Sequence, residues 1–286
     1  MISGNFRILN IATMAACLLA CHSCKSINEI TDPQGCGPIG VCLCNRECNF
    51  MNILNETDST CVGIESGEIY KVRYTIGEDD LSWDHYYIFV AIQQESSDFY
   101  RREMLEDPAY AYGSLKYRCP GDAGIEDQMK QLYTPFMDGR AWLDIDSEPW
   151  KNGSGLEYRT EECTSISIRS TSPLFGRPAE SEISDQFVFD PNFGERVTFP
   201  FKACLISYDK KVLGLLDGCM SVDEYLSYRP MVLPYFNFKL VDAPVELIER
   251  GSLETDFIVE IGLGNGKQLK DTTHVKLLMP EDVADR

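Results

Sequence analysis

The chain has 286 residues, enough for one or two domains. Hydrophobic residues make up 44% of it and aromatic residues 11%, which excludes a wholly disordered chain because these side chains can build a core. The 45 acidic residues against 26 basic ones give a net charge of −19, which excludes a nucleic-acid phosphate binder and a polybasic membrane-docking surface.

An apolar run over residues 8–20 starts close to the N-terminus, and only Asn10 and Thr13 interrupt it. Arg7 is the one charged residue before the run. The run is too short to span a bilayer, which takes about 20 apolar residues. A short apolar run behind a weakly positive start is typical of a secretory signal peptide, so we expect residues 1–20 to be cleaved.

The run ends in Leu18-Leu19-Ala20-Cys21, which resembles the lipobox of bacterial lipoproteins. The resemblance implies that Cys21 becomes the first mature residue and carries acyl chains that anchor the protein in a lipid bilayer. Residues 21–35 are then expected to be a polar tether between the lipid and the fold.

Residues 36–66 are rich in cysteine, glycine and proline and have few apolar residues to bury. Without Cys17 and Cys21, an even number of cysteines remains in the mature chain, as full disulfide pairing requires. An exported protein favours disulfides, so we predict them, without assigning pairs, among Cys24, Cys36, Cys42, Cys44, Cys48, Cys61, Cys119, Cys163, Cys204 and Cys219. The close spacing of Cys42, Cys44 and Cys48 also suggests a zinc site, but zinc ligand pairs prefer gaps of two to four residues, so we predict no metal.

Residues 67–286 predict a mainly β domain. Alternating or apolar segments indicate strands over residues 68–76, 85–92, 164–170, 197–207, 255–263 and 267–279. The segment 85–92 is nearly all apolar, as expected of a strand that is covered on both faces. The last two strands flank Gly264-Asn265-Gly266, where Asn-Gly is expected to provide the positive φ angles of a tight hairpin turn.

Short helices are predicted over residues 97–106, near residues 127–133 and over residues 221–228. The last begins with a capping box, Ser221-Val222-Asp223-Glu224. Together these elements indicate an antiparallel β-sandwich-like domain with a few short helices.

No catalytic motif is evident in the sequence. The three histidines are His22, His85 and His274, and neither Gly-x-Ser-x-Gly nor His-Glu-x-x-His occurs. We therefore predict no catalytic residues and no cofactor. A glycosidase needs only two carboxylates, however, and 45 acidic residues leave that alternative open.

Trp142 and Trp150, which lie in a loop-rich region, are candidates for an aromatic platform that binds a ligand such as a sugar. Packing in the core is the more common role of aromatic side chains.

The order of lipobox, polar tether and β-rich domain is similar to that of exported lipoproteins of Bacteroidetes. The resemblance implies an outer-membrane lipoprotein of the bacterial cell envelope, on its periplasmic or surface face. We expect a non-catalytic binding or structural module for a protein or glycan partner, and no nucleic acid. The alternative is a carboxylate-dependent glycan hydrolase of the envelope.

Overall fold

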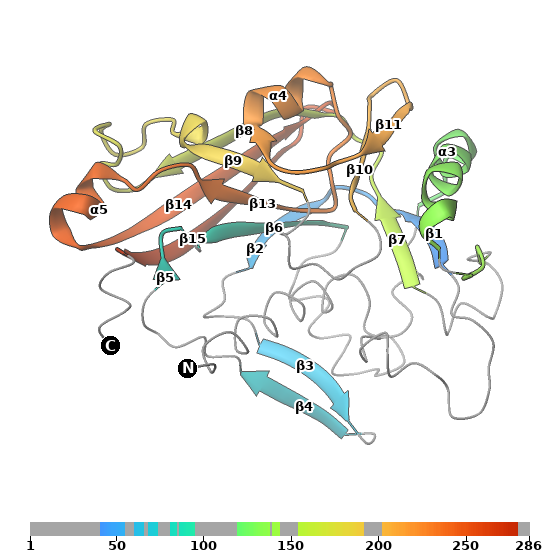
Figure 1. The fold of residues 1–286 in the computed structure, drawn as a ribbon, viewed down its shortest axis with the longest axis horizontal. Coiled ribbons are helices and arrows are strands. Elements are labelled where there is room, and N and C mark those ends of the chain that lie inside the picture. Colours follow the sequence, from blue (N-terminus) through green and yellow to red (C-terminus); the bar gives the residue numbers. More distant parts are fainter. Residues whose placement is uncertain are drawn as a thin grey trace.

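The computed structural model describes residues 41–54, 60–65, 68–73, 81–84, 86–94, 119–137, 139–143, 154–191 and 202–279. Within these ranges the fold is mainly β, with mostly antiparallel sheets and three short α-helices, which confirms the predicted class (Figure 1). Cys21, Cys24, Cys36, Trp150 and the helix predicted over residues 97–106 lie outside the described residues. No helix in the described part of the chain has the length and hydropathy to cross a membrane.

The larger sheet has five strands in the order β12-β9-β13-β6-β2. Its members are β2 (Phe50–Leu54), β6 (Tyr87–Gln93), β9 (Phe187–Asp190), β12 (Met220–Ser221) and β13 (Tyr235–Leu240). Every residue of β6 from Ile88 to Gln93 is buried, so this strand is covered on both faces, as its apolar sequence predicted.

The second sheet has four strands in the order β5-β15-β14-β8. Its members are β5 (Leu81–Ser82), β8 (Cys163–Ser170), β14 (Ser252–Leu263) and β15 (Gln268–Leu278). Buried and exposed side chains alternate along β14 and β15, so one face of the sheet forms core and the other carries charged residues. The predicted hairpin at the end of the chain is therefore confirmed.

The turn of this hairpin differs from the expected one. Only Gly266 has a positive φ, of 83°, and Asn265 does not. The Leu263 N–H donates to the Lys267 carbonyl at 2.9 Å, which closes a three-residue loop ending on a left-handed glycine. The Asn265 side chain instead accepts a hydrogen bond from the Lys267 N–H at 2.9 Å, which fixes the loop without a left-handed asparagine.

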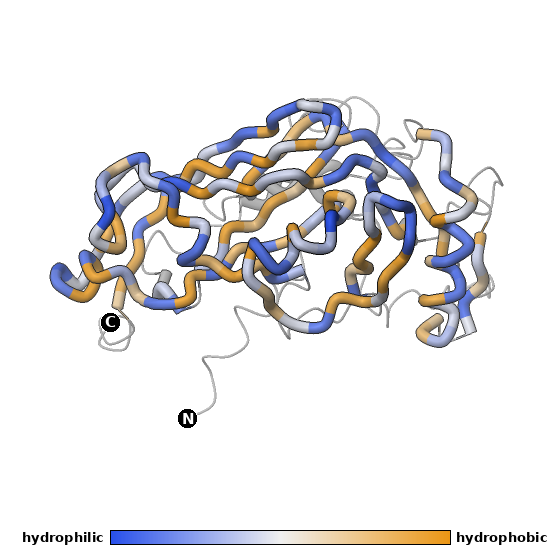
Figure 2. Tube along the Cα trace, turned by 90° about the horizontal axis from the view of Figure 1, so that it is seen from above, coloured by the Kyte–Doolittle hydropathy of each residue, from blue (hydrophilic) through white to orange (hydrophobic). Residues whose placement is uncertain are grey.

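The two sheets enclose the main hydrophobic core. Phe187 of the five-stranded sheet meets Phe257 of the four-stranded sheet edge to face, with ring centroids 5.5 Å apart. At one side β2 approaches β15, where the Ile53 N–H donates to Asp271 Oδ2 at 2.7 Å. Figure 2 shows hydrophobic and hydrophilic residues alternating along the strands, as expected of a sandwich whose inner faces pack together.

A second, smaller core lies beside the sandwich. It is formed by β1 (Val41–Asn45) in parallel with β7 (Ser154–Tyr158), by α3 (Ala123–Tyr133), and by the hairpin of β10 (Cys204–Ile206) and β11 (Val212–Leu215). Figure 1 shows these elements gathered at one end of the molecule. Residues 41–54, which belong to the predicted cysteine-rich segment, thus pair as β1 and β2 with strands far along the chain.

The remaining elements are short. They are the hairpin of β3 (Thr60–Glu65) and β4 (Glu68–Arg73), α4 (Val222–Ser227), α5 (Val245–Arg250), and the 3-10 turns Thr134–Phe136 and Ser184–Gln186. The Ser221 side chain accepts from the Glu224 N–H at 3.0 Å, so the predicted cap of α4 is present. Asp122 caps α3 in the same way, accepting from the Gly124 and Ile125 N–H groups.

Candidate functional site

The cysteines that the structure describes form no disulfide. Free thiols are present at Cys44, Cys48, Cys119, Cys163, Cys204 and Cys219, and of Cys61 only the backbone is described, in β3. Burial raises the pKa of the Cys163 and Cys204 thiols to about 12, so both stay protonated at neutral pH. No cluster of three or more metal-ligating side chains occurs among the described residues.

Trp142, the described member of the predicted aromatic platform, is half-buried. Its ring packs against the smaller core, and its Nε1–H donates to Thr134 Oγ1 at 3.0 Å. Its backbone forms a parallel bridge with Val41. This side chain therefore takes part in packing beside β1, which is the common role of tryptophan in a fold.

His274 lies on the exposed face of β15, between two carboxylates of β14. Its Nδ1 is 2.7 Å from Asp256 Oδ1 and its Nε2 is 3.2 Å from Glu254 Oε1. The hydrogen bond to Asp256 and the charge of both carboxylates raise the pKa of His274. Both ring nitrogens of His274 face carboxylates and neither is directed at a nucleophile, so this site is unsuited to nucleophile activation.

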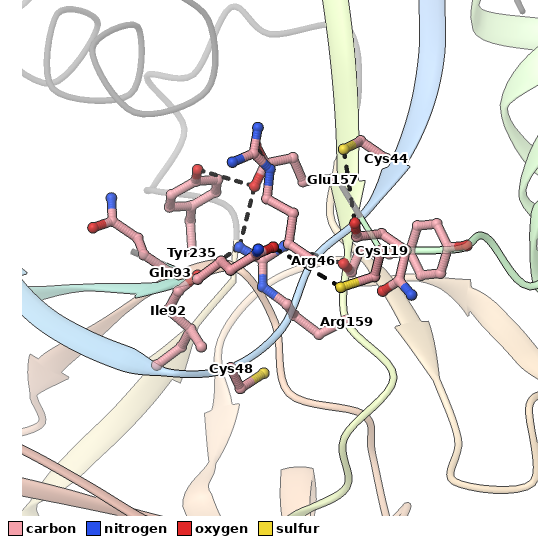
Figure 3. Close-up of polar contacts among 12 residues, drawn as sticks. Cys44, Arg46, Cys48, Ile92, Gln93, Cys119, Glu157, Arg159 and Tyr235 are labelled. Atoms are coloured by element: carbon pink, nitrogen blue, oxygen red, sulfur yellow. Dashed lines mark hydrogen bonds and ion pairs between the residues drawn. The ribbon is translucent and has the colours of Figure 1, made fainter. Parts of the chain in front are cut away.

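One group of three charged residues in the described chain is buried. Arg46 follows β1, Glu157 lies in β7 and Arg159 follows β7, and we call these three residues the buried ion cluster. The exposed fractions of their side chains are 4%, 10% and 1%. Figure 3 shows the three side chains converging beside Tyr235 and the end of β6.

Glu157 is the centre of the buried ion cluster. Its Oε1 is 3.2 Å from Arg46 Nε, and its Oε2 is 3.1 Å from Arg159 Nη2. The Tyr235 hydroxyl donates to the same Oε2 at 3.3 Å (Figure 3). Burial alone would raise the pKa of Glu157, but the two guanidinium groups outweigh it and lower the pKa, so the carboxylate is ionised at neutral pH.

Arg159 connects the smaller core to the sandwich. Its Nη2 donates to the Ile92 carbonyl in β6 at 2.5 Å, and its Nη1 donates to the Tyr158 carbonyl at 3.0 Å. One buried guanidinium thus joins the end of β7 to the five-stranded sheet. The arrangement fits a structural clamp, because its polar groups are directed at each other and at the backbone.

A second buried carboxylate is also paired with a cation. Asp190 of β9 is 3% exposed, and its Oδ2 is 2.7 Å from Lys239 Nζ of β13. Next to it in the ladder, Asn237 pairs with Asp190 and is almost fully buried. Glu157 and Asp190 therefore both face cations within the fold.

Two exposed tyrosines lie in the turn between β10 and β11 and at the end of α4. Tyr208 is 48% exposed and Tyr228 is 42% exposed. The Arg229 guanidinium lies over the Tyr208 ring, 4.9 Å from its centroid, and its Nε donates to Glu162 Oε1 at 2.9 Å. We call Tyr208, Tyr228 and Arg229 the tyrosine patch.

The sequence alone indicates neither the buried ion cluster nor the tyrosine patch. Arg46 and Glu157 lie 111 positions apart, and only the parallel pairing of β1 with β7 brings them together. Tyr208 and Arg229 are joined through the hydrogen bond from the Tyr208 N–H to the Arg229 carbonyl, at 2.8 Å. Comparisons with known proteins found no matching family model and no significantly similar curated protein or solved structure.

Proposed function

We propose that the protein is a non-catalytic binding or structural module of the bacterial cell envelope, anchored to the outer membrane by acyl chains on Cys21, and that it recognises a protein or glycan partner. The non-catalytic part of this proposal rests on the pairing of the buried carboxylates with cations. Glu157 and Asp190 are both held by cations within the fold, whereas Tyr208 and Tyr228 are exposed at the surface.

The state of Glu157 also weighs against the hydrolase alternative at this site. Glycoside hydrolysis needs one carboxyl group that stays protonated long enough to donate to the leaving group, which requires a raised pKa. The pKa of Glu157 is lowered by Arg46 and Arg159. A broad screen of polysaccharides should therefore release no reducing sugar in the presence of the full chain, and reproducible release would restore the hydrolase alternative.

The anchor is tested by detergent phase partitioning of the full chain, expressed in a bacterium with an outer membrane. Wild type should enter the detergent phase, because acyl chains bury many methylene groups at about 0.8 kcal/mol each. Cys21→Ser should stay in the aqueous phase. Cys24→Ser is the matched control, and it should partition like wild type. If wild type and Cys21→Ser partition alike, the anchor is rejected.

A further inference from the structure

We draw no further inference here: the strongest candidate, the side-chain cluster of Asp190, Lys239 and Cys219 at the β9 side of the five-stranded sheet, carries nothing because its one deeply buried carboxylate is already paired with the lysine at 2.7 Å and no contact among the described residues shows which ligand the exposed thiol beside it would take.

Discussion

Replacing Glu157 with glutamine removes the one negative charge of the buried ion cluster and leaves two buried guanidinium groups. Each contact, at 3.2 and 3.1 Å, contributes roughly 5 kcal/mol of attraction at an effective dielectric of about 20. The substitution also removes the cost of burying the carboxylate, which is several kcal/mol. We therefore expect a net loss of about 3–5 kcal/mol in the free energy of unfolding, the usual cost of breaking a buried pair.

The assay is urea unfolding followed by circular dichroism, which gives the free energy of unfolding. In a separate temperature scan, the thermal midpoint of Glu157→Gln is expected to lie roughly 6–20 °C below that of wild type. Glu260→Gln is the matched control, because Glu260 also lies between two cations, Arg169 at 2.5 Å and Lys270 at 3.0 Å. Its side chain is 30% exposed, so its loss should cost less than about 1 kcal/mol. Equal losses in the two variants would refute the reasoning that burial makes the Glu157 cluster the stronger one.

The pH dependence of the free energy of unfolding, compared between wild type and Glu157→Gln, gives an independent check. The pKa of Glu157 is lowered from its ordinary value of 4.5, so its contribution to stability is fully present above pH 4.5 and is lost as the pH falls through the folded-state pKa. The difference between wild type and Glu157→Gln should hold constant from pH 5 to 7 and narrow in more acidic solution. A difference that widens on acidification would contradict the ionised state.

The other predictions concern single groups. The pKa of His274 is raised by Asp256, so an NMR titration should show it moving back toward 6.5 in Asp256→Asn. In wild type, the stability that this pair provides below pH 6.5 should be lost as the pH rises through the raised pKa. An unchanged pKa of His274 in Asp256→Asn would exclude Asp256 as the cause. Asp122→Ala should destabilise the protein by about 1 kcal/mol in chemical denaturation, and Asp122→Asn, which also caps helices, by much less; similar losses would argue against the cap. Iodoacetamide at pH 8 should label the exposed Cys219 in the native protein. It should label Cys204 only after unfolding, because this thiol is buried and its pKa is about 12. Equal labelling of both cysteines in the native protein would show that Cys204 is accessible.

Local chemistry explains which elements could be predicted from the sequence. The alternating pattern of residues 255–263 is repeated in the alternating burial of β14, and the apolar segment 85–92 became a strand buried on both faces. Ser221 and Glu224 form the expected cap. These features depend on neighbours within a few positions, so the sequence determines them directly.

The polar groups of the interior depend on distant neighbours and could not be predicted in the same way. Arg46 lies in a cysteine-rich segment that suggested disulfides or a metal, and nothing local indicates that its partner is Glu157. The turn at Asn265 shows a finer limit: the sequence indicates a turn, but the side-chain hydrogen bond to Lys267 decides its geometry. Trp142 likewise packs beside β1, a strand about 100 residues earlier in the chain.

The parallel pairing of β1 with β7 has a consequence for how quickly the chain reaches its final state. Val41 and Ser154 pair across 113 positions, whereas Gly262 and Gln268 pair across six. Closing the longer loop costs ~3 kcal/mol more in chain entropy, so the last hairpin is expected to form early and the β1–β7 pair late. Until that late step, Arg46 and Glu157 remain hydrated apart from each other, and these two charges enter the interior only as folding is completed.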